Sequence, residues 1–89
     1  MQPYELRLAP SPRRSLQSLP IGAATAIAEF ISGPLCANPR RVGKPLQREL
    51  VGRYSARIRD YRVIYRIFDE ESVVLVLRIE HRADVYRHR

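Results

Sequence analysis

Apolar residues and arginines alternate along the stretch "RYSARIRDYRVIYRI", and this feature constrains the fold of the chain more than any other. The runs at 53–58 and 61–68 have the alternating period of half-buried β-strands, and a single Arg59-Asp60 dipeptide separates them. Because so short a connection can join only antiparallel neighbours, we predict a β-hairpin whose loop is Arg59-Asp60.

The two faces of this hairpin differ in chemistry, because directly opposed residues lie on the same face of a sheet. We expect the apolar face to pack against the rest of the core; it comprises Tyr54, Ala56, Ile58, Tyr61, Val63, Tyr65 and Ile67. The opposite face comprises Arg53, Ser55, Arg57, Arg62, Ile64 and Arg66. Neither strand places an acid between the arginines of this second face.

The arginine face has two explanations. In the predicted register Arg57 opposes Arg62. Arg53 likewise opposes Arg66, and like charges opposed across strands destabilise a sheet. A surface that binds an anion tolerates this repulsion because the ligand relieves it, whereas a surface that needs only solubility mixes the two signs. The pattern therefore favours a phosphate-binding face over the alternative, a solvated face of arginines.

The size and charge of the chain bear on the kind of partner. Its 89 residues predict a single domain over 1–89 with little room for a deep pocket, so any chemistry must take place on an open face. The 16 basic residues outnumber the 9 acidic ones, and the net charge of +7 favours a polyanionic partner. All basic residues except Lys44 are arginines, which suit bidentate contact with phosphate, although GC-rich codon usage produces the same excess.

Three negative features of the sequence concern the compartment. Cys36 is the single cysteine, so an internal disulfide is excluded, as is usual in a reducing compartment. No apolar run approaches the length of a membrane span, and the start "MQPYELRLAP" lacks the apolar core of a signal peptide. We therefore expect a cytoplasmic protein without a membrane partner.

Proline and glycine delimit two helices in the first part of the chain. Residues 4–8 alternate as a short strand, one helix follows from Ser11-Pro12 to Pro20, and a second runs from there to Gly33-Pro34. The apolar residues of these helices recur at helical spacing; they are Leu16, Leu19, Ala24, Ile27, Ala28, Ile31 and Leu35. Both helices are therefore expected to cover one face of a sheet.

The second half of the chain completes the predicted fold. Residues 36–52 carry few regular signals, and we expect Leu46 and Leu50 to attach this connection to the core. An acidic turn at 69–72 leads from the hairpin into a buried apolar strand at 73–79. We predict an α+β domain of element order β-α-α-β-β-β, in which two N-terminal helices pack on one face of a four-stranded antiparallel sheet.

The string "GKPLQRELVGRYSARIRDYRVIYRIFDEESVVLVLRIEHRADVY", residues 43–86, resembles a known family. It is similar to the signature half of the RelE-type messenger-RNA endonucleases in the RelE/ParE superfamily of bacterial type II toxins. The shared features are a Leu-x-Gly lead-in, a basic strand, a "YRVIY" strand, an acidic turn, an apolar strand and a closing "HRADVY". The order of the predicted elements also matches that superfamily over about the whole chain.

The resemblance implies an activity and a set of partners. RelE-type toxins enter the ribosomal A site and cut messenger RNA there, by attack of the ribose 2′-hydroxyl on the adjacent phosphate without metal or other cofactor. A cognate antitoxin, an acidic protein usually encoded beside the toxin, silences it. The toxin–antitoxin complex often binds operator DNA and represses its own promoter. The expected partners are therefore antitoxin, ribosome and messenger RNA, with DNA bound only through the complex.

The resemblance also implies roles for individual residues. Arg62 matches the phosphate-binding arginine of the "YR" strand, and Arg82 matches the second arginine, in "HRADVY". Both would meet the negative charge that builds on the phosphoryl oxygens in the transition state. Tyr86 matches the closing tyrosine, which stacks on a base and takes part in proton transfer. The plainer alternatives are solvated arginines and a tyrosine that caps the core.

The basic strand departs from the family pattern. Relatives often carry two lysines there, where this chain has Ser55 and Arg57. Arg57 can hold a phosphate, but an arginine is effectively never deprotonated and makes a poor general base. The role of the base then falls to Tyr86 or to His81, because histidine is the side chain that most often serves as a general base. Relatives also commonly carry glycine near Arg59, so the assumed loop lacks its usual turn residue.

Further basic residues and one serine are expected to contact RNA backbone without reading sequence, unless they form a merely solvated loop or face. These residues are Arg40, Arg41 and Lys44 in the irregular segment, with Arg53, Ser55 and Arg66 on the hairpin.

Two other functions remain open from the sequence. ParE-type toxins share the fold but poison DNA gyrase, and the set Arg57, Arg62, Arg82 and Tyr86 favours the nuclease over them. A toxin homologue that only binds its antitoxin is the other alternative, which the altered basic strand keeps open. A metal-dependent nuclease is disfavoured, because His81 and His88 have no cysteine or carboxylate cluster beside them in the sequence.

Overall fold

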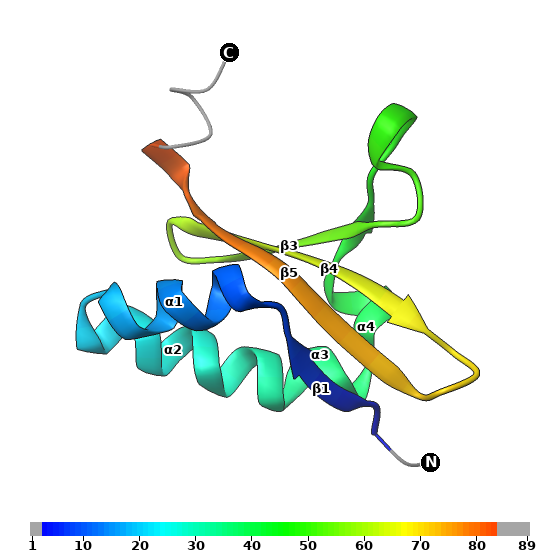
Figure 1. Ribbon diagram of the computed structural model, residues 1–89, viewed down its shortest axis with the longest axis horizontal. Coiled ribbons are helices and arrows are strands. Elements are labelled where there is room, and N and C mark those ends of the chain that lie inside the picture. The colour runs from blue at the N-terminus through cyan, green and yellow to red at the C-terminus, as the bar shows by residue number, and fades with distance from the viewer. Residues whose placement is uncertain (1–2, 84–89) are drawn as a thin grey trace.

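Two helices cover one face of a five-stranded sheet of strand order β1-β5-β4-β3-β2 (Figure 1). The computed structural model describes residues 3–83. Its elements are β1 (Glu5–Leu8), α1 (Pro10–Ser18), α2 (Ile21–Ser32), α3 (Pro34–Ala37), α4 (Pro39–Val42), β2 (Lys44–Pro45), η1 (Arg48–Leu50), β3 (Tyr54–Ile58), β4 (Tyr61–Phe68) and β5 (Val73–His81). Within this described part, no helix combines the length and apolarity needed to cross a membrane.

The sheet is mixed and has five strands, so the predicted four-stranded antiparallel sheet is wrong. β1 runs parallel to β5, with Glu5 opposite Val73. The helices connect β1, at one edge of the sheet, to β2, at the other edge. The chain then returns across the sheet through β3 and β4, and β5 lies beside β1 and runs in the same direction. The strand that was not predicted is β2, which has only two residues and pairs with the edge of β3. A strand this short leaves no periodicity in the sequence to reveal it.

The predicted hairpin register is confirmed. β3 and β4 pair antiparallel with Ile58 opposite Tyr61 and Arg57 opposite Arg62. Arg59 adopts a left-handed backbone with φ of 52°, the conformation that a glycine usually supplies in such a turn. The chain therefore makes the tight turn without glycine, and the two faces of the hairpin are those expected from the alternation.

The core lies between the helices and the apolar face of the hairpin, as predicted. Its buried residues come from α2, α3 and the three central strands; they are Ile27, Ile31, Leu35, Ala56, Val63, Tyr65, Val74 and Val76. Leu16 and Leu19, in α1 and just after it, pack against this cluster at its margin. Leu35 belongs to α3, because the backbone breaks at Gly33 before a new helical turn begins at Pro34.

The connection between α2 and β3 is more regular than its sequence indicates, since it contains α3, α4, β2 and η1. The expectation that Leu50 contacts the core is wrong, because this residue is 41% exposed. Positive φ angles at Arg48 and Gly52, 61° and 93°, turn the chain at each end of η1. The η1 turn consequently projects away from the sheet (Figure 1).

Candidate functional site

A groove of about 720 Å³ lies on the face of the sheet opposite the helices. Its lining residues are Arg41, Val42, Gly43, Lys44, Pro45, Leu46, Ser55, Arg57 and Arg62. Arg57 and Arg62 reach the groove as a cross-strand pair from β3 and β4. Lys44 joins them because β2 pairs with β3 with Lys44 opposite Ser55. One wall is thus the predicted arginine face and the other is the segment that precedes β3.

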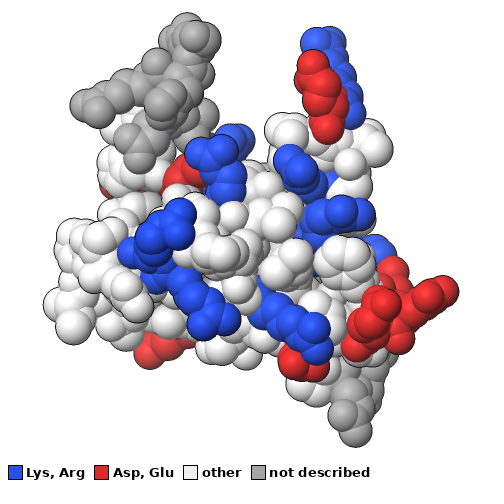
Figure 2. All heavy atoms as spheres, viewed as in Figure 1, with Lys and Arg blue, Asp and Glu red and all other residues white. Residues whose placement is uncertain are grey.

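The charge of the groove is of one sign. Arg41, Lys44, Arg57 and Arg62 are cations, and no acid is among the described residues that line it. Figure 2 shows a hollow between the end of β5 and the segment bearing η1, with basic side chains on both sides. Acidic side chains also lie at the tip of the η1 segment and beside the end of β5, and a larger group lies near the turn between β4 and β5. A concave surface with one sign of charge concentrates its field on a counter-ion, so this groove suits an anion.

Tyr65 fixes the segment that forms the second wall. Its side chain is fully buried, and its hydroxyl donates a hydrogen bond of 2.6 Å to the carbonyl oxygen of Pro39. Burial, with a smaller contribution from Tyr54, raises the pKa of this hydroxyl to about 12. A Cβ on Gly43 would collide with the Tyr65 hydroxyl and lie 2.9 Å from the carbonyl oxygen of Ser55. Only glycine allows the backbone to pass this close beside the groove.

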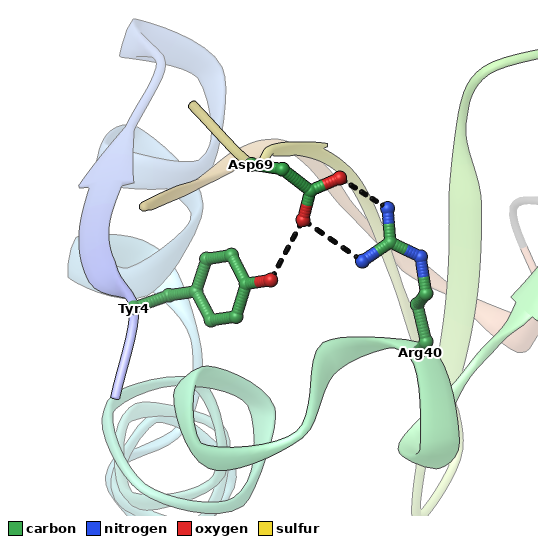
Figure 3. Close-up of polar contacts among 3 residues, drawn as sticks. All are labelled: Tyr4, Arg40 and Asp69. Carbon is green, nitrogen blue, oxygen red and sulfur yellow. Dashed lines mark hydrogen bonds and ion pairs between the residues drawn. The ribbon is translucent and has the colours of Figure 1, made fainter. Parts of the chain in front are cut away.

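Arg40 lies at the outer end of the same segment, where it joins three parts of the chain (Figure 3). Its guanidinium donates two hydrogen bonds to Asp69, at 3.0 and 2.6 Å, and the Tyr4 hydroxyl donates a third of 2.7 Å to the same carboxylate. These bonds, that from Arg40 above all, lower the pKa of Asp69 to about 2. This set of hydrogen bonds among Tyr4, Arg40 and Asp69, which we call the clip, attaches α4 to the start of β1 and to the β4–β5 turn. It also directs Arg40 away from the groove, which the next residue, Arg41, lines.

Sequence reasoning missed Glu80, which provides an acid beside Arg62. Arg62 donates from Nε and Nη2 to Glu80 Oε1, at 3.2 and 2.8 Å, and Arg78 Nε lies 3.2 Å from Oε2. β5 continues to His81, beyond the predicted end at residue 79, and Glu80 lies opposite Arg62 in the pairing of β4 with β5. The arginine face is therefore less purely basic than the hairpin alone indicates.

His81 and Arg82, two of the predicted catalytic residues, are not among the described residues that line the groove. His81 lies opposite Tyr61, which packs against the core, so its ring is on the helix side of the sheet. The two rings meet edge to face at 4.9 Å, and Nδ1 accepts a hydrogen bond from Ala83 N–H. Arg82 is exposed and follows the strand, and its backbone N–H donates to the carbonyl oxygen of Asp60. Tyr86 lies outside the described residues. The catalytic roles of these three residues stay predictions.

The remaining predicted contacts fall into two groups. Arg41, Lys44 and Ser55 line the groove. Arg53 and Arg66 are exposed outside it, and the Arg66 guanidinium lies over the Phe68 ring at 5.1 Å. The described lining can therefore bind a phosphate with several cations, but it holds no carboxylate or imidazole to act as a general base.

Comparison with known proteins assigns the family. A family model described as the ParE toxin of the type II toxin–antitoxin system parDE matches residues 14–86. Toxin RelG of Mycobacterium tuberculosis is 51% identical over 85 residues, which are 96% of this chain and 98% of that protein. Toxin RelE of the same organism is 45% identical over 85 residues, 96% of this chain and 88% of that protein.

Solved structures agree. A chain of the RelBE2 toxin–antitoxin complex of M. tuberculosis has 50% identity and a TM-score of 0.88, over 94% of this chain and 97% of its own length. A chain of the intact E. coli RelBE complex has 21% identity and a TM-score of 0.73, over 88% and 95%, and supports the fold alone.

The fold, the length and these matches define a class of small α+β toxins. The chain belongs to the RelE/ParE superfamily of type II toxin–antitoxin toxins, as the resemblance of residues 43–86 indicated. Within that superfamily it is a toxin of the RelE/RelG type.

Proposed function

We propose that this toxin is an mRNA interferase, a ribosome-dependent endonuclease that cuts messenger RNA in the ribosomal A site and so inhibits translation. The observation that carries the proposal is the groove of one sign of charge in a RelE/RelG-type chain, with Arg57 and Arg62 side by side in it. Glu80 offsets part of the charge of Arg62, and a phosphodiester between the two arginines would be bound by both.

The chemistry follows from the charges of the groove. The ribose 2′-hydroxyl attacks the adjacent phosphorus, the bond to the 5′-oxygen breaks, and the 5′-hydroxyl leaves with a proton. Arg57 and Arg62 stabilise the negative charge that develops on the phosphoryl oxygens, and Arg82 adds a third cation from the end of β5. Tyr86 stacks on a base beside the cleavage point, and its hydroxyl takes part in the transfer of the proton from the 2′-hydroxyl. His81 on the helix face is a weaker candidate for the base than Tyr86.

The other cations extend the contact with RNA. Arg41 and Lys44 in the groove, with exposed Arg53 and Arg66, contact phosphates of messenger or ribosomal RNA and hold the toxin in place. Arg40 contributes indirectly, because its guanidinium is engaged by Asp69.

Primer extension on a defined messenger, translated by purified ribosomes with and without the toxin, tests this function. We expect new 5′ ends within the A-site codon that appear only when ribosomes are present. Intact messenger under these conditions, together with arrested growth in cells, would overturn the nuclease assignment.

The second candidate function is poisoning of DNA gyrase. It is favoured by the family model that matches the chain, whose description is that of a ParE toxin. The paired arginines of the groove and the RelE/RelG relatives favour the nuclease. A supercoiling assay with purified gyrase separates the two, since an interferase leaves supercoiling unchanged. A homologue that only binds antitoxin would be inactive in both assays.

We further propose that a cognate antitoxin, encoded by the adjacent gene, silences the toxin. Solved relatives include toxin–antitoxin complexes, such as RelBE2 of M. tuberculosis. An acidic amphipathic segment complements the net charge of +7 and covers the basic groove or the apolar surface beside it. The complex, rather than the free toxin, would contact operator DNA.

A further inference from the structure

The pairing of β4 with β5 contains an irregularity that changes the face on which Glu80 lies. Tyr65 lies opposite Val76 and Ile64 opposite Arg78, so Leu77 is an extra residue in β5. Val76 before the bulge is buried under the helices. With unbroken alternation Glu80 would follow Val76 onto that same face. The bulge reverses the phase and brings Glu80 to the face of Arg62.

Glu80 holds a specific edge of the Arg62 guanidinium. Nε and Nη2 both donate to one carboxylate oxygen, so the contact is side-on and leaves the Nη1 side of the guanidinium for another anion. Glu80 is not among the residues that line the groove, whereas Arg62 is. The carboxylate therefore holds Arg62 from the side away from the groove. The Glu80 side chain is only 16% exposed, which keeps this contact largely out of solvent.

We propose that Glu80 is a positioning residue, which fixes the Arg62 guanidinium so that its Nη1 side meets the phosphate in the groove. This inference rests on the proposed nuclease function and adds a residue to it. Arg78 holds the second carboxylate oxygen and keeps the carboxylate in place. A cation that is oriented in advance stabilises a developing charge without reorganisation, so the effect should be on the chemical step.

Two other roles for the same contact give different results. If Glu80 were a competing anion that occupies Arg62, its removal would raise affinity for phosphate and speed cleavage. If the ion pair served stability alone, its removal would lower the melting temperature and leave the turnover of the folded protein unchanged. Positioning instead predicts a lower kcat, with little change in KM, because other cations of the groove and surface still bind RNA.

The test is the kinetics of messenger cleavage on programmed ribosomes for wild type, Glu80→Gln and Glu5→Gln. Glu5 is the matched control, because it also pairs with an arginine, Arg7, at 3.3 Å, and its change removes the same charge. We expect Glu80→Gln to lower kcat by about 10–100-fold with KM within about 2-fold, and Glu5→Gln to resemble wild type. A kcat that is unchanged or raised in Glu80→Gln overturns the inference. A wild type that leaves messenger intact overturns the proposed function instead.

A second measurement uses only the wild-type chain and covers the case in which Glu80→Gln does not fold. The ¹⁵N-resolved NMR signal of Arg62 Nε–H reports the contact with Glu80, and inorganic phosphate serves as the probe of the groove. We expect this N–H to exchange slowly with water, and to stay protected while phosphate shifts the Nη signals. Loss of protection on addition of phosphate would show that Glu80 competes with the ligand, and would overturn positioning independently of nuclease activity.

Discussion

At the scale of single residues, the site depends on two that carry no charge. Tyr65 attaches the groove wall to the core through Pro39, and Gly43 permits the close approach that this contact needs. Sequence reasoning placed Tyr65 correctly in the core but gave Gly43 no such role. The alternation of a strand reveals which face a side chain occupies, whereas the distance between a loop and that side chain depends on the folded chain.

Gly43→Ala should destabilise the protein by about 1–3 kcal/mol, because the added methyl overlaps a buried hydroxyl that cannot move freely. Urea unfolding followed by circular dichroism measures the difference. Gly22→Ala is the matched control, since a Cβ there has nothing within 4 Å and should not destabilise the fold. Equal unfolding midpoints for wild type and Gly43→Ala would show that the backbone at residue 43 can shift to accommodate the methyl group.

Tyr86→Phe distinguishes stacking from proton transfer. If the ring only stacks on a base, phenylalanine retains most of the cleavage rate on programmed ribosomes. We expect instead that the hydroxyl moves a proton, because the described groove lining contains no carboxylate or imidazole. The rate should then fall by about 10²–10⁴-fold, as for loss of a general acid or base. Activity near the wild-type level would assign proton transfer to another residue.

At the scale of elements, the clip of Tyr4, Arg40 and Asp69 connects β1, α4 and the β4–β5 turn. These segments are far apart in the sequence and none is long. Their attachment was not predictable from the sequence, because an arginine in an irregular segment has the same pattern whether it binds RNA or a carboxylate. The hairpin was predictable since its alternation and its two-residue loop determine one register.

The clip should make stability depend on acid pH. The pKa of Asp69 in the folded protein is lowered from 3.8 to about 2, so its contribution is fully present above pH 3.8 and is lost as pH falls toward 2. Asp69→Asn should therefore be less stable than wild type near neutral pH. The difference in free energy of unfolding between the two should shrink as the pH falls from 3.8 to about 2. Urea midpoints over this pH range measure it, and Glu70→Gln is a control for charge in the same turn. A difference that is constant with pH would contradict the titration.

At the scale of the whole molecule, the α+β class, the helices on one face and the basic opposite face followed from the sequence. The parallel pairing of β1 with β5 did not, because it joins the two ends of the chain and no local signal records it. Glu80 was missed for a similar reason. Its face depends on the bulge at Leu77, and residues 73–77 are all apolar, so the sequence shows no break in alternation there.

The proposed antitoxin should stabilise the whole toxin by mass action. A partner that binds only the folded chain adds about 4 kcal/mol to unfolding when its free concentration is about 1,000 times Kd. The melting temperature should therefore rise when purified antitoxin is added, and the rise should increase with antitoxin concentration. An unchanged melting temperature at saturating antitoxin would contradict specific binding of the native toxin.

If Arg62 in the groove stabilises the cleaved phosphate, its loss should slow cleavage far more than the loss of an arginine elsewhere. We therefore compare Arg62→Ala with Arg13→Ala. Arg13 belongs to α1 and is not among the residues lining the groove, so both variants lose one arginine but only one loses a groove cation. Cleavage is followed by primer extension on programmed ribosomes under single-turnover conditions. We expect a loss of about 10²–10³-fold for Arg62→Ala and a near wild-type rate for Arg13→Ala. Equal rates for the two variants would contradict this role of Arg62.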